Sequence, residues 1–256
     1  MKYAFRASAA AALLALPLLA GAQAKPDPEF TFSGNAGLFS DYRFRGFTQT
    51  GYAPAFQGGF DFAHKSGFYL GNWNSNVEQG LYNGASLEMD FYGGYKFSAG
   101  DLGFDVGYLY YYYPNSGALG STKIDHGELY AGASWGPVSA KLFYAVTEFF
   151  ALGTGAAGVD TKGSWYLDLN ASFPLAQGWT AVAHYGYQDI ADGKKAGLIE
   201  DSVSDWKLGV TYDLSGWLLG ASVIGTTEKN LFTTAESGFT EGGGKTSLVV
   251  SVSKAF

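Results

Sequence analysis

Apolar and polar residues alternate along most of the chain. Leu87, Met89 and Phe91, for example, alternate with Glu88 and Asp90. A period of two is typical of a β-strand with one apolar face and one polar face. The same pattern recurs to the last residue and predicts about twelve strands, which begin near residues 30, 54, 68, 86, 102, 126, 138, 163, 178, 204, 217 and 245.

The connections between these strands fall into two classes, which alternate along the chain. Short connections such as Gly136-Pro137 and Leu214-Ser215-Gly216 alternate with longer polar or glycine-rich ones around residues 46–53, 78–85, 114–125, 150–162, 189–203 and 227–244. An even number of strands with short turns at one end and long loops at the other is typical of outer-membrane barrels. The predicted fold class is therefore an all-β, transmembrane, antiparallel up-and-down barrel with short periplasmic turns and longer extracellular loops.

The composition favours a barrel with lipid outside and water inside. Charged residues make up only 15% of the chain, while aromatic residues make up 17%. The outward face of a soluble barrel is rich in charged side chains, whereas the polar face here carries Gly, Ser, Asn, Thr and Tyr. A closed barrel also satisfies every backbone N–H and C=O group within hydrocarbon. A soluble β-barrel or sandwich is the competing architecture.

Residues 1–24 are predicted to be a secretory signal peptide. Lys2 and Arg6 precede a short apolar stretch that Pro17 interrupts, and Ala22-Gln23-Ala24 has the pattern of a cleavage site. Residues 25–256 are then expected to form one barrel in the outer membrane of a Gram-negative bacterium, in contact with its lipid.

The last strand carries a second targeting signal. Leu248, Val250 and Val252 alternate with serines, and the chain ends at Phe256. A terminal aromatic residue on an amphipathic strand resembles the signal that the barrel assembly machinery recognises. Lys254 stands where a hydrophobic residue is usual, but its aliphatic stem can snorkel at the interface.

Charge and cysteine content exclude several classes of function. The chain has no cysteine, so it has no disulfide or thiolate metal site, and its net charge of −7 comes without any run of basic residues. Such a chain is a poor partner for nucleic acid. No His, Asp or Glu cluster shows metal-ligand spacing, and we expect neither a metal nor a cofactor.

Five segments resemble the TorF-type porin family of Gram-negative outer-membrane proteins. They are Ser40–Gly46, Pro54–Gly59, Ser66–Trp73, Glu88–Tyr95 and Tyr110–Pro114. The resemblance is strongest over residues 33–114 and runs weakly to the C-terminus. It implies an outer-membrane channel whose function is largely inferred, without an established substrate or catalytic residue.

Three charged residues in the first predicted strand are candidates for the channel lining. Asp41, Arg43 and Arg45 share one face of the strand, opposite Tyr42 and Phe44. Because a guanidinium facing lipid costs several kcal/mol, we expect the aromatic rings to face lipid and the charges to face the lumen.

Glu88, Asp90 and Tyr92 also share the inward face of their predicted strand. One hypothesis is that Arg43 and Arg45 face carboxylates across the lumen and form a charged constriction, whose field orients passing solutes. The alternative is that these ion pairs simply fill and plug a narrow barrel.

The remaining inward charges are mainly acidic. Asp61, Asp105, Glu128, Asp168, Asp205 and Asp213 outnumber Lys96, Lys141 and Lys207 on the inward positions. A lumen lined by carboxylates favours cations, so the sequence predicts a weak cation preference.

His184 is the candidate for an enzymatic alternative. A Ser–His–Asn site acting on lipid needs its histidine at the lipid face and a serine within hydrogen-bond reach, but the alternation places His184 in the lumen, and the chain lacks a Gly-x-Ser-x-Gly elbow. We therefore expect a monomeric channel for passive diffusion of small hydrophilic solutes, not an enzyme. The alternatives are a plugged barrel that acts through its extracellular loops and a lipid-modifying enzyme.

Overall fold

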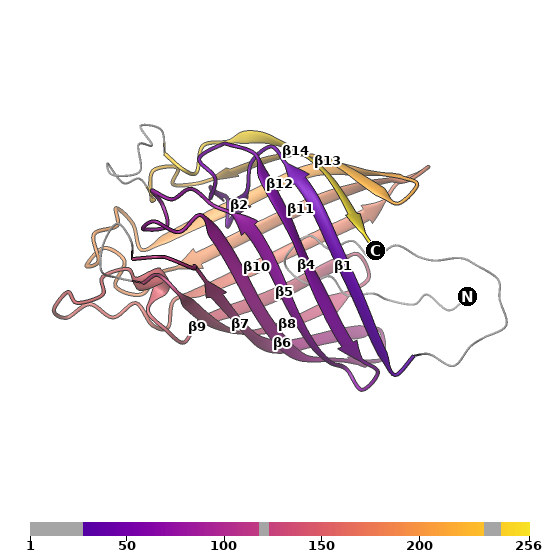
Figure 1. Cartoon of the computed structure of the whole chain (residues 1–256), viewed down its shortest axis with the longest axis horizontal. Helices are drawn as coiled ribbons and strands as arrows, with labels where there is room; N and C mark the ends of the chain where they lie inside the picture. Colours follow the sequence, from indigo (N-terminus) through magenta and orange to yellow (C-terminus); the bar gives the residue numbers. More distant parts are fainter. Residues whose placement is uncertain (1–27, 118–122, 233–241) are drawn as a thin grey trace.

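A computed structural model of the chain describes residues 28–117, 123–232 and 242–256. The predicted signal peptide, residues 1–24, lies outside these ranges. Within them, twelve antiparallel strands form one closed barrel, with a two-stranded hairpin inside the first loop (Figure 1). No helix in the described ranges is long and apolar enough to cross a membrane.

The strands follow one another around the barrel in chain order, and β1 closes it against β14. The barrel strands are β1 (Phe30–Phe39), β4 (Ala55–His64), β5 (Phe68–Asn76), β6 (Leu87–Ala99), β7 (Leu102–Tyr112), β8 (His126–Trp135), β9 (Val138–Ala145), β10 (Trp165–Pro174), β11 (Trp179–Asp189), β12 (Ser202–Leu214), β13 (Trp217–Thr226) and β14 (Ser247–Ala255). A short 3₁₀ helix, Phe149–Ala151, lies in the fourth long loop. The observed strands begin within two residues of the predicted starts, so the predicted fold class is confirmed.

The short turns and the long loops lie at opposite ends of the barrel (Figure 1). At the turn between β12 and β13, Ser215 and Gly216 have φ angles of 52° and 88°, the left-handed pair that a two-residue hairpin requires. Phe30 and Phe256 lie at this same end, which we call the turn end. The backbone N–H of Phe256 donates to the oxygen of Gly34 (2.9 Å), which fixes the last residue to β1.

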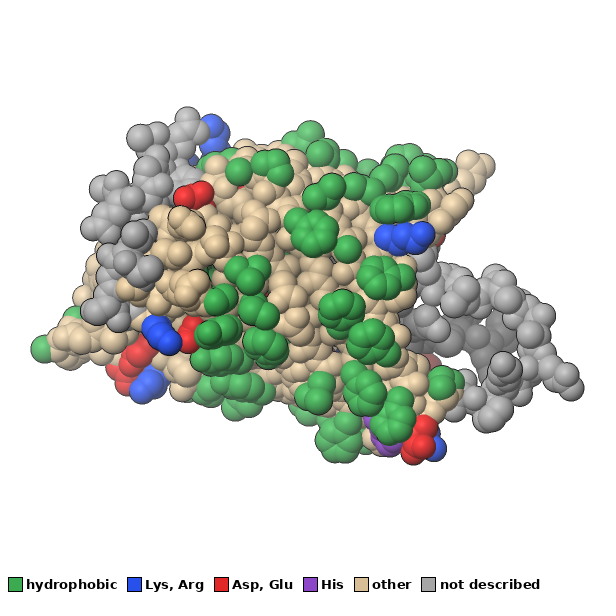
Figure 2. Space-filling model, in the orientation of Figure 1, with side chains coloured by type: hydrophobic (Ala, Val, Ile, Leu, Met, Phe, Trp, Pro, Cys, Tyr) green, Lys and Arg blue, Asp and Glu red, His purple; other side chains and the backbone are tan. Residues whose placement is uncertain are grey.

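The outer wall of the barrel is apolar. Phe32, Leu70 and Leu248 are 70%, 65% and 63% exposed, and Figure 2 shows hydrophobic side chains over the wall with charged ones mainly near the two ends. A soluble barrel would bury these side chains inside. The apolar faces of the strands therefore point outward, as the membrane interpretation requires. Near the turn end, Lys254 stacks its ammonium 5.0 Å from the centre of the Trp217 ring.

The first long loop corrects the prediction for residues 41–45. Strand β1 ends at Phe39, so Asp41, Arg43 and Arg45 do not belong to a barrel strand. Instead β2 (Arg43–Phe44) pairs with β3 (Phe47–Thr48) to form a hairpin, which we call the L1 hairpin. Its turn residues Arg45 and Gly46 have φ angles of 47° and 82°. The prediction was wrong because alternation continues through a tight hairpin as well as through a long strand.

The aromatic side chains of this loop pack inside the barrel and do not face lipid. Tyr42 is only 8% exposed and meets Trp73 edge-on at 5.2 Å, while Phe44 packs against Tyr111 and Phe150. Burial of these rings removes apolar surface from water, which favours the inward fold of the loop.

Two hydrophobic clusters fill the barrel beneath its long loops. The first contains Tyr42, Trp73, Val77, Tyr82, Tyr111 and Tyr113. The second contains Phe47, Phe149, Ile190, Val203 and Leu231. Both clusters take side chains from several loops as well as from strands, so the loop end of the lumen has a packed interior, which we call the loop-end core.

Candidate functional site

A cavity of about 470 Å³ occupies the lumen between the L1 hairpin and the turn end. Its lining includes Arg43 and Arg45 on the hairpin and reaches Gly103, Gly216 and Ala255 beside the short turns. The candidate functional site is therefore inside the barrel, below the loop-end core.

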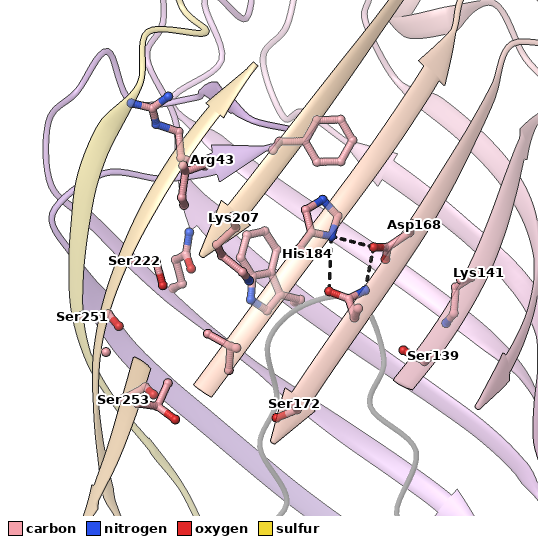
Figure 3. Close-up of a pocket in the computed structure, with 18 of the residues that line it drawn as sticks. Arg43, Ser139, Lys141, Asp168, Ser172, His184, Lys207, Ser222, Ser251 and Ser253 are labelled. Carbon is pink, nitrogen blue, oxygen red and sulfur yellow. Dashed lines mark hydrogen bonds and ion pairs between the residues drawn. The ribbon is translucent and has the colours of Figure 1, made fainter. Parts of the chain in front are cut away.

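One side of this cavity is lined by small hydroxylated side chains. Thr211, Ser222, Ser251 and Ser253 come from β12, β13 and β14 and face the cavity; Figure 3 labels the three serines. A Cβ atom at Gly209 would lie 2.1 Å from the Ser222 hydroxyl oxygen. Glycine on this side of the barrel, which we call the hydroxyl wall, therefore leaves room for the hydroxyl groups of the neighbouring strand.

The opposite side of the lumen is filled by aromatic rings. Tyr69, Tyr130, Phe143 and Tyr166 form a buried cluster on β5, β8, β9 and β10, which we call the tyrosine wall. Phe143 and Tyr166 line the cavity on this side, together with small residues of β9 and β10 such as Ser139 and Ser172.

The charged side chains Lys141 and Asp105 on the tyrosine wall are bound to other protein groups. Lys141 Nζ lies 2.8 Å from Asp105 Oδ2, and the Tyr69 hydroxyl donates to Asp105 Oδ1 at 2.5 Å. Tyr130 shares a hydrogen bond with the Tyr69 hydroxyl. Both oxygens of Asp105 are therefore occupied by protein groups.

Tyr92 faces the lumen, as the alternation predicted. Its hydroxyl donates to Asp61 Oδ1 at 2.7 Å, and its ring lies over Gly71, where a Cβ would come within 2.2 Å of a ring carbon. Tyr92 thus contacts a carboxylate of β4 and is not among the residues that line the cavity.

His184 lies on β11 and faces the cavity (Figure 3). Its Nδ1 atom lies 3.0 Å from Asp168 Oδ1 and its Nε2 atom 2.8 Å from Asp205 Oδ1. The Tyr166 hydroxyl donates to the other oxygen of Asp205 at 2.9 Å, and Asn170 Nδ2 donates to Asp168 Oδ1 at 2.6 Å. The imidazole is thus clamped between two carboxylates on adjacent strands.

This arrangement does not resemble a nucleophilic site. The hydrogen-bond partners of His184 among the described residues are acidic groups, Tyr166 and Asn170, without a serine. A Ser–His pair acting on membrane lipid would need a serine beside a histidine at the outer face. The described residues contain no group of three or more His, Asp or Glu that could hold a metal ion.

Arg45 of the L1 hairpin reaches across the lumen to the opposite wall. Its Nη2 atom lies 2.7 Å from Glu128 Oε2 and 2.8 Å from Glu128 Oε1. The guanidinium carbon lies 4.3 Å from the centre of the Tyr166 ring, and Gln188 accepts a further hydrogen bond. The side chains of Arg45 and Glu128 are 6% and 1% exposed, so this is a buried ion pair that fixes the hairpin inside the barrel.

Arg43 is held within the loop region. Its Nε atom lies 2.5 Å from Asp41 Oδ2 in the same hairpin. Its Nη1 atom donates to the backbone oxygens of Gly46 and Lys245, and its Nη2 atom donates to Ser247 Oγ at 2.8 Å. Arg43 therefore joins the first loop to the sixth.

Glu88 and Asp90 face inward, but neither is paired with the two arginines. They are 1% and 8% exposed, and the Tyr42 hydroxyl donates to Glu88 Oε1 at 2.9 Å. Burial raises the pKa of the Tyr42 phenol well above its usual value, so the hydroxyl keeps the proton that it donates. The carboxylates that pair with Arg43 and Arg45 are Asp41 and Glu128.

The alternation placed Glu128 among the acidic residues of the lumen, but nothing in the sequence identified it as the partner of Arg45. The two residues meet only because the first loop turns back into the barrel at Arg45 and Gly46. The available signal was Arg45-Gly46 between two phenylalanines, since a residue followed by Gly between β-forming residues can close a two-residue hairpin.

Two solved porin structures have a similar fold. The KdgM porin, solved in complex with disordered oligogalacturonate, is 9% identical with a TM-score of 0.52, and the NanC porin is 7% identical with a TM-score of 0.54. Each comparison covers 88% of this chain and 99% of the porin. At such low identity, these comparisons show a shared barrel fold.

The sequence comparisons assign the family. No curated protein sequence matches this chain. The resemblance to TorF-type porins stays a prediction, because the matching family has no such description. The match to the Gcw_chp family extends over residues 23–256, and this chain therefore belongs to that family of bacterial proteins of unknown function.

Proposed function

We propose that this protein is a porin-like channel of the Gram-negative outer membrane, through which small hydrophilic solutes diffuse passively. The supporting observation is a closed barrel with an apolar outer wall around a cavity of about 470 Å³ with polar side chains. An apolar band facing lipid and a polar interior are the features of outer-membrane channels.

The L1 hairpin is the proposed constriction. The cavity lining includes Asp41, Arg43 and Arg45, and Arg45 crosses the lumen to Glu128. Charged side chains that face one another across a narrow lumen impose a transverse field on a passing solute. We expect this part of the channel to set both its conductance and its selectivity.

A weak cation preference is also proposed. Carboxylates outnumber basic side chains on the inward positions, but Asp41, Asp105 and Glu128 are already paired with Arg43, Lys141 and Arg45. Paired charges attract mobile ions less than free ones, so the expected preference is small. Anion preference in a salt gradient would contradict it.

Single-channel recording in planar bilayers tests the channel proposal. We expect discrete openings whose conductance changes in Arg43→Ala, because that guanidinium joins the constriction to the sixth loop. Lys65→Ala is the control, since Lys65 is a 62% exposed residue at a short turn. Equal conductance in the unaltered protein and in Arg43→Ala would show that Arg43 is not part of the constriction. A protein that shows no openings would contradict the channel proposal.

A plugged barrel that acts through its loops is the second candidate. It is supported by the loop-end core, in which Phe47, Tyr82 and Phe149 lie between 3% and 7% exposed. Such a barrel stays silent in bilayers even when Arg45→Ala breaks the ion pair that fixes the hairpin. Openings in that variant would favour the channel.

The barrel is proposed to be a monomer.

The last strand is the proposed contact for the barrel assembly machinery. Phe256 is 70% exposed and directly follows β14, the strand that closes the barrel against β1. An exposed aromatic side chain is available for recognition before insertion. Phe256→Ala should lower the amount of folded barrel in the outer membrane, with Phe30→Ala as the exposed aromatic control.

A further inference from the structure

Lys207 is the basic group of the cavity that the contacts described above leave unused. It lies on β12, directly across from His184 on β11, and its side chain lines the cavity (Figure 3). In the described ranges it makes neither an ion pair within 4.0 Å nor a side-chain hydrogen bond, in contrast to Lys141 and Arg45. An ammonium group has three hydrogen-bond donors, so Lys207 presents donors to whatever occupies the cavity.

Asp205 and Asp168, on β12 and β10 beside Lys207 and His184, both bind His184. Asp205 uses one oxygen for His184 and the other for Tyr166. Asp168 Oδ1 receives both His184 and Asn170. These contacts hold the two carboxylates on His184, and Lys207 forms no ion pair with either of them although all three residues line the cavity.

Free hydroxyl groups extend from Lys207 along the hydroxyl wall. Thr211 shares the inward face of β12 with Lys207, and its hydroxyl oxygen is buried without a hydrogen-bond partner in the described part of the chain. Between the two lies Gly209, over which the Ser222 hydroxyl is placed. Ser222 and Ser251 also make no hydrogen bond to another described side chain, although both line the cavity. A buried hydroxyl without a partner is costly, and a polar ligand would satisfy it.

These groups select a particular ligand chemistry. The ammonium favours a carboxylate through a charge-assisted hydrogen bond, and the adjacent hydroxyls exchange hydrogen bonds with a polyhydroxylated chain. A single free ammonium, with Asp168, Asp205 and Asp213 along the same cavity, favours one negative charge and opposes a second.

We propose that Lys207, Ser222 and Thr211 form a binding subsite for small hydroxycarboxylates inside the lumen. This inference deepens the proposed channel function, on which it rests, by naming a class of solute. The subsite lies in the cavity below the L1 hairpin and is reached from the turn end of the barrel.

Isothermal titration of the purified protein in detergent with gluconate tests this proposal. We expect Lys207→Met to weaken gluconate binding at least tenfold, because the charge-assisted hydrogen bond is lost, and Lys207→Arg to keep it within a few fold. Glucose, which has the hydroxyls without the charge, and citrate, which carries additional charges, should each bind at least tenfold more weakly than gluconate.

Lys96→Met is the matched control. Lys96 also faces the lumen, but its ammonium lies 4.4 Å from the centre of the Tyr69 ring on the tyrosine wall and it does not line the cavity. Gluconate binding should be the same in this variant as in the protein. Folding of each variant is checked by heat-dependent gel migration and by circular dichroism, and Lys207→Arg supplies a second test if Lys207→Met does not fold.

The proposal is overturned if gluconate does not bind, if Lys207→Met binds it as the protein does, or if glucose binds equally well. The titration requires no membrane, so it separates the two proposals. Gluconate binding by a protein that shows no openings in bilayers would contradict the channel proposal and support the subsite. An open channel that does not bind gluconate would contradict the subsite alone.

Discussion

The two halves of this barrel are built from the same strands but have opposite interiors. At the loop end, Phe47 and Phe149 are 3% and 5% exposed in a packed core. At the turn end, Ser251 and Ser253 line a cavity of about 470 Å³. The strands alternate in the same way through both halves. A barrel of this size is therefore filled or hollow according to whether loops and large rings enter it, and strand number alone does not decide.

The basic side chains of the two halves differ too, because one is paired and the other is not. Arg45 at the loop end is buried against Glu128, whereas Lys207 in the cavity has no ion pair within the described residues. Breaking a buried pair leaves an uncompensated charge, so Arg45 stabilises the fold of the loop. Replacing Lys207, whose ammonium group has no such partner in the described part of the chain, should cost little folding stability. That ammonium group is available to a solute.

Arg45→Ala is expected to have the largest effect on this comparison. It leaves the Glu128 carboxylate, 1% exposed, without its cation, at a cost of about 3–5 kcal/mol. The L1 hairpin should then open, with faster amide hydrogen exchange over residues 40–50 and a higher single-channel conductance. Lys162→Ala breaks an exposed pair with Glu148 and should leave both unchanged. Slow exchange in Arg45→Ala would show that the loop-end core holds the hairpin without the ion pair.

Phe47→Ala tests the packing of the loop-end core. Phe47 is 3% exposed and meets Phe232 edge-on at 4.8 Å, so its truncation should cost about 3 kcal/mol of local stability. Hydrogen exchange of the first and sixth loops measures this cost. Ile199→Ala, at a loop position 54% exposed, should cost far less. Equal effects would mean that the loop end is not packed as a core.

Gly46→Ala tests the hairpin turn. A Cβ there meets Thr226 Cγ2 at 2.5 Å and Asp205 Cβ at 2.6 Å, in a backbone with φ of 82°. The expected cost is about 2 kcal/mol, part of it from the left-handed conformation. Gly100→Ala has a similar φ of 61° with nothing within 4 Å, so it measures the conformational cost alone, about 1 kcal/mol. Urea unfolding in vesicles compares the two, and identical midpoints would contradict the close approach.

Ser251→Ala should have the smallest effect. Its hydroxyl makes no hydrogen bond to another described residue and faces the cavity, so unfolding in urea should change by less than about 0.5 kcal/mol. Ser164→Ala is the contrasting change, because the Ser164 hydroxyl is 1% exposed and donates to Thr161 O at 2.7 Å. A large loss in Ser251→Ala would show that the hydroxyl wall stabilises the barrel and is not merely its lining.

Residues on the barrel strands were predictable, and those on the first loop were not. Leu87 and Phe91 lie on the outer face and Glu88 and Asp90 on the inner face, as the period of two requires. Asp41 and Arg43 follow the same alternation but lie in a loop, because a hairpin preserves the alternation while reversing the direction of the chain. The period of two therefore does not show where the chain reverses, and Arg45-Gly46 was the local signal for this turn.

The amino-acid sequence by itself determined the strands, the alternation of short and long connections and the outward direction of the apolar side chains, because each depends on residues that are close along the chain. Only the tertiary structure decided the inward position of the L1 hairpin, the pairing of Arg45 with Glu128 and the absence of an ion pair at Lys207 among the described residues. These features depend on which walls face one another across the lumen, and that distance is set by closure of the whole barrel.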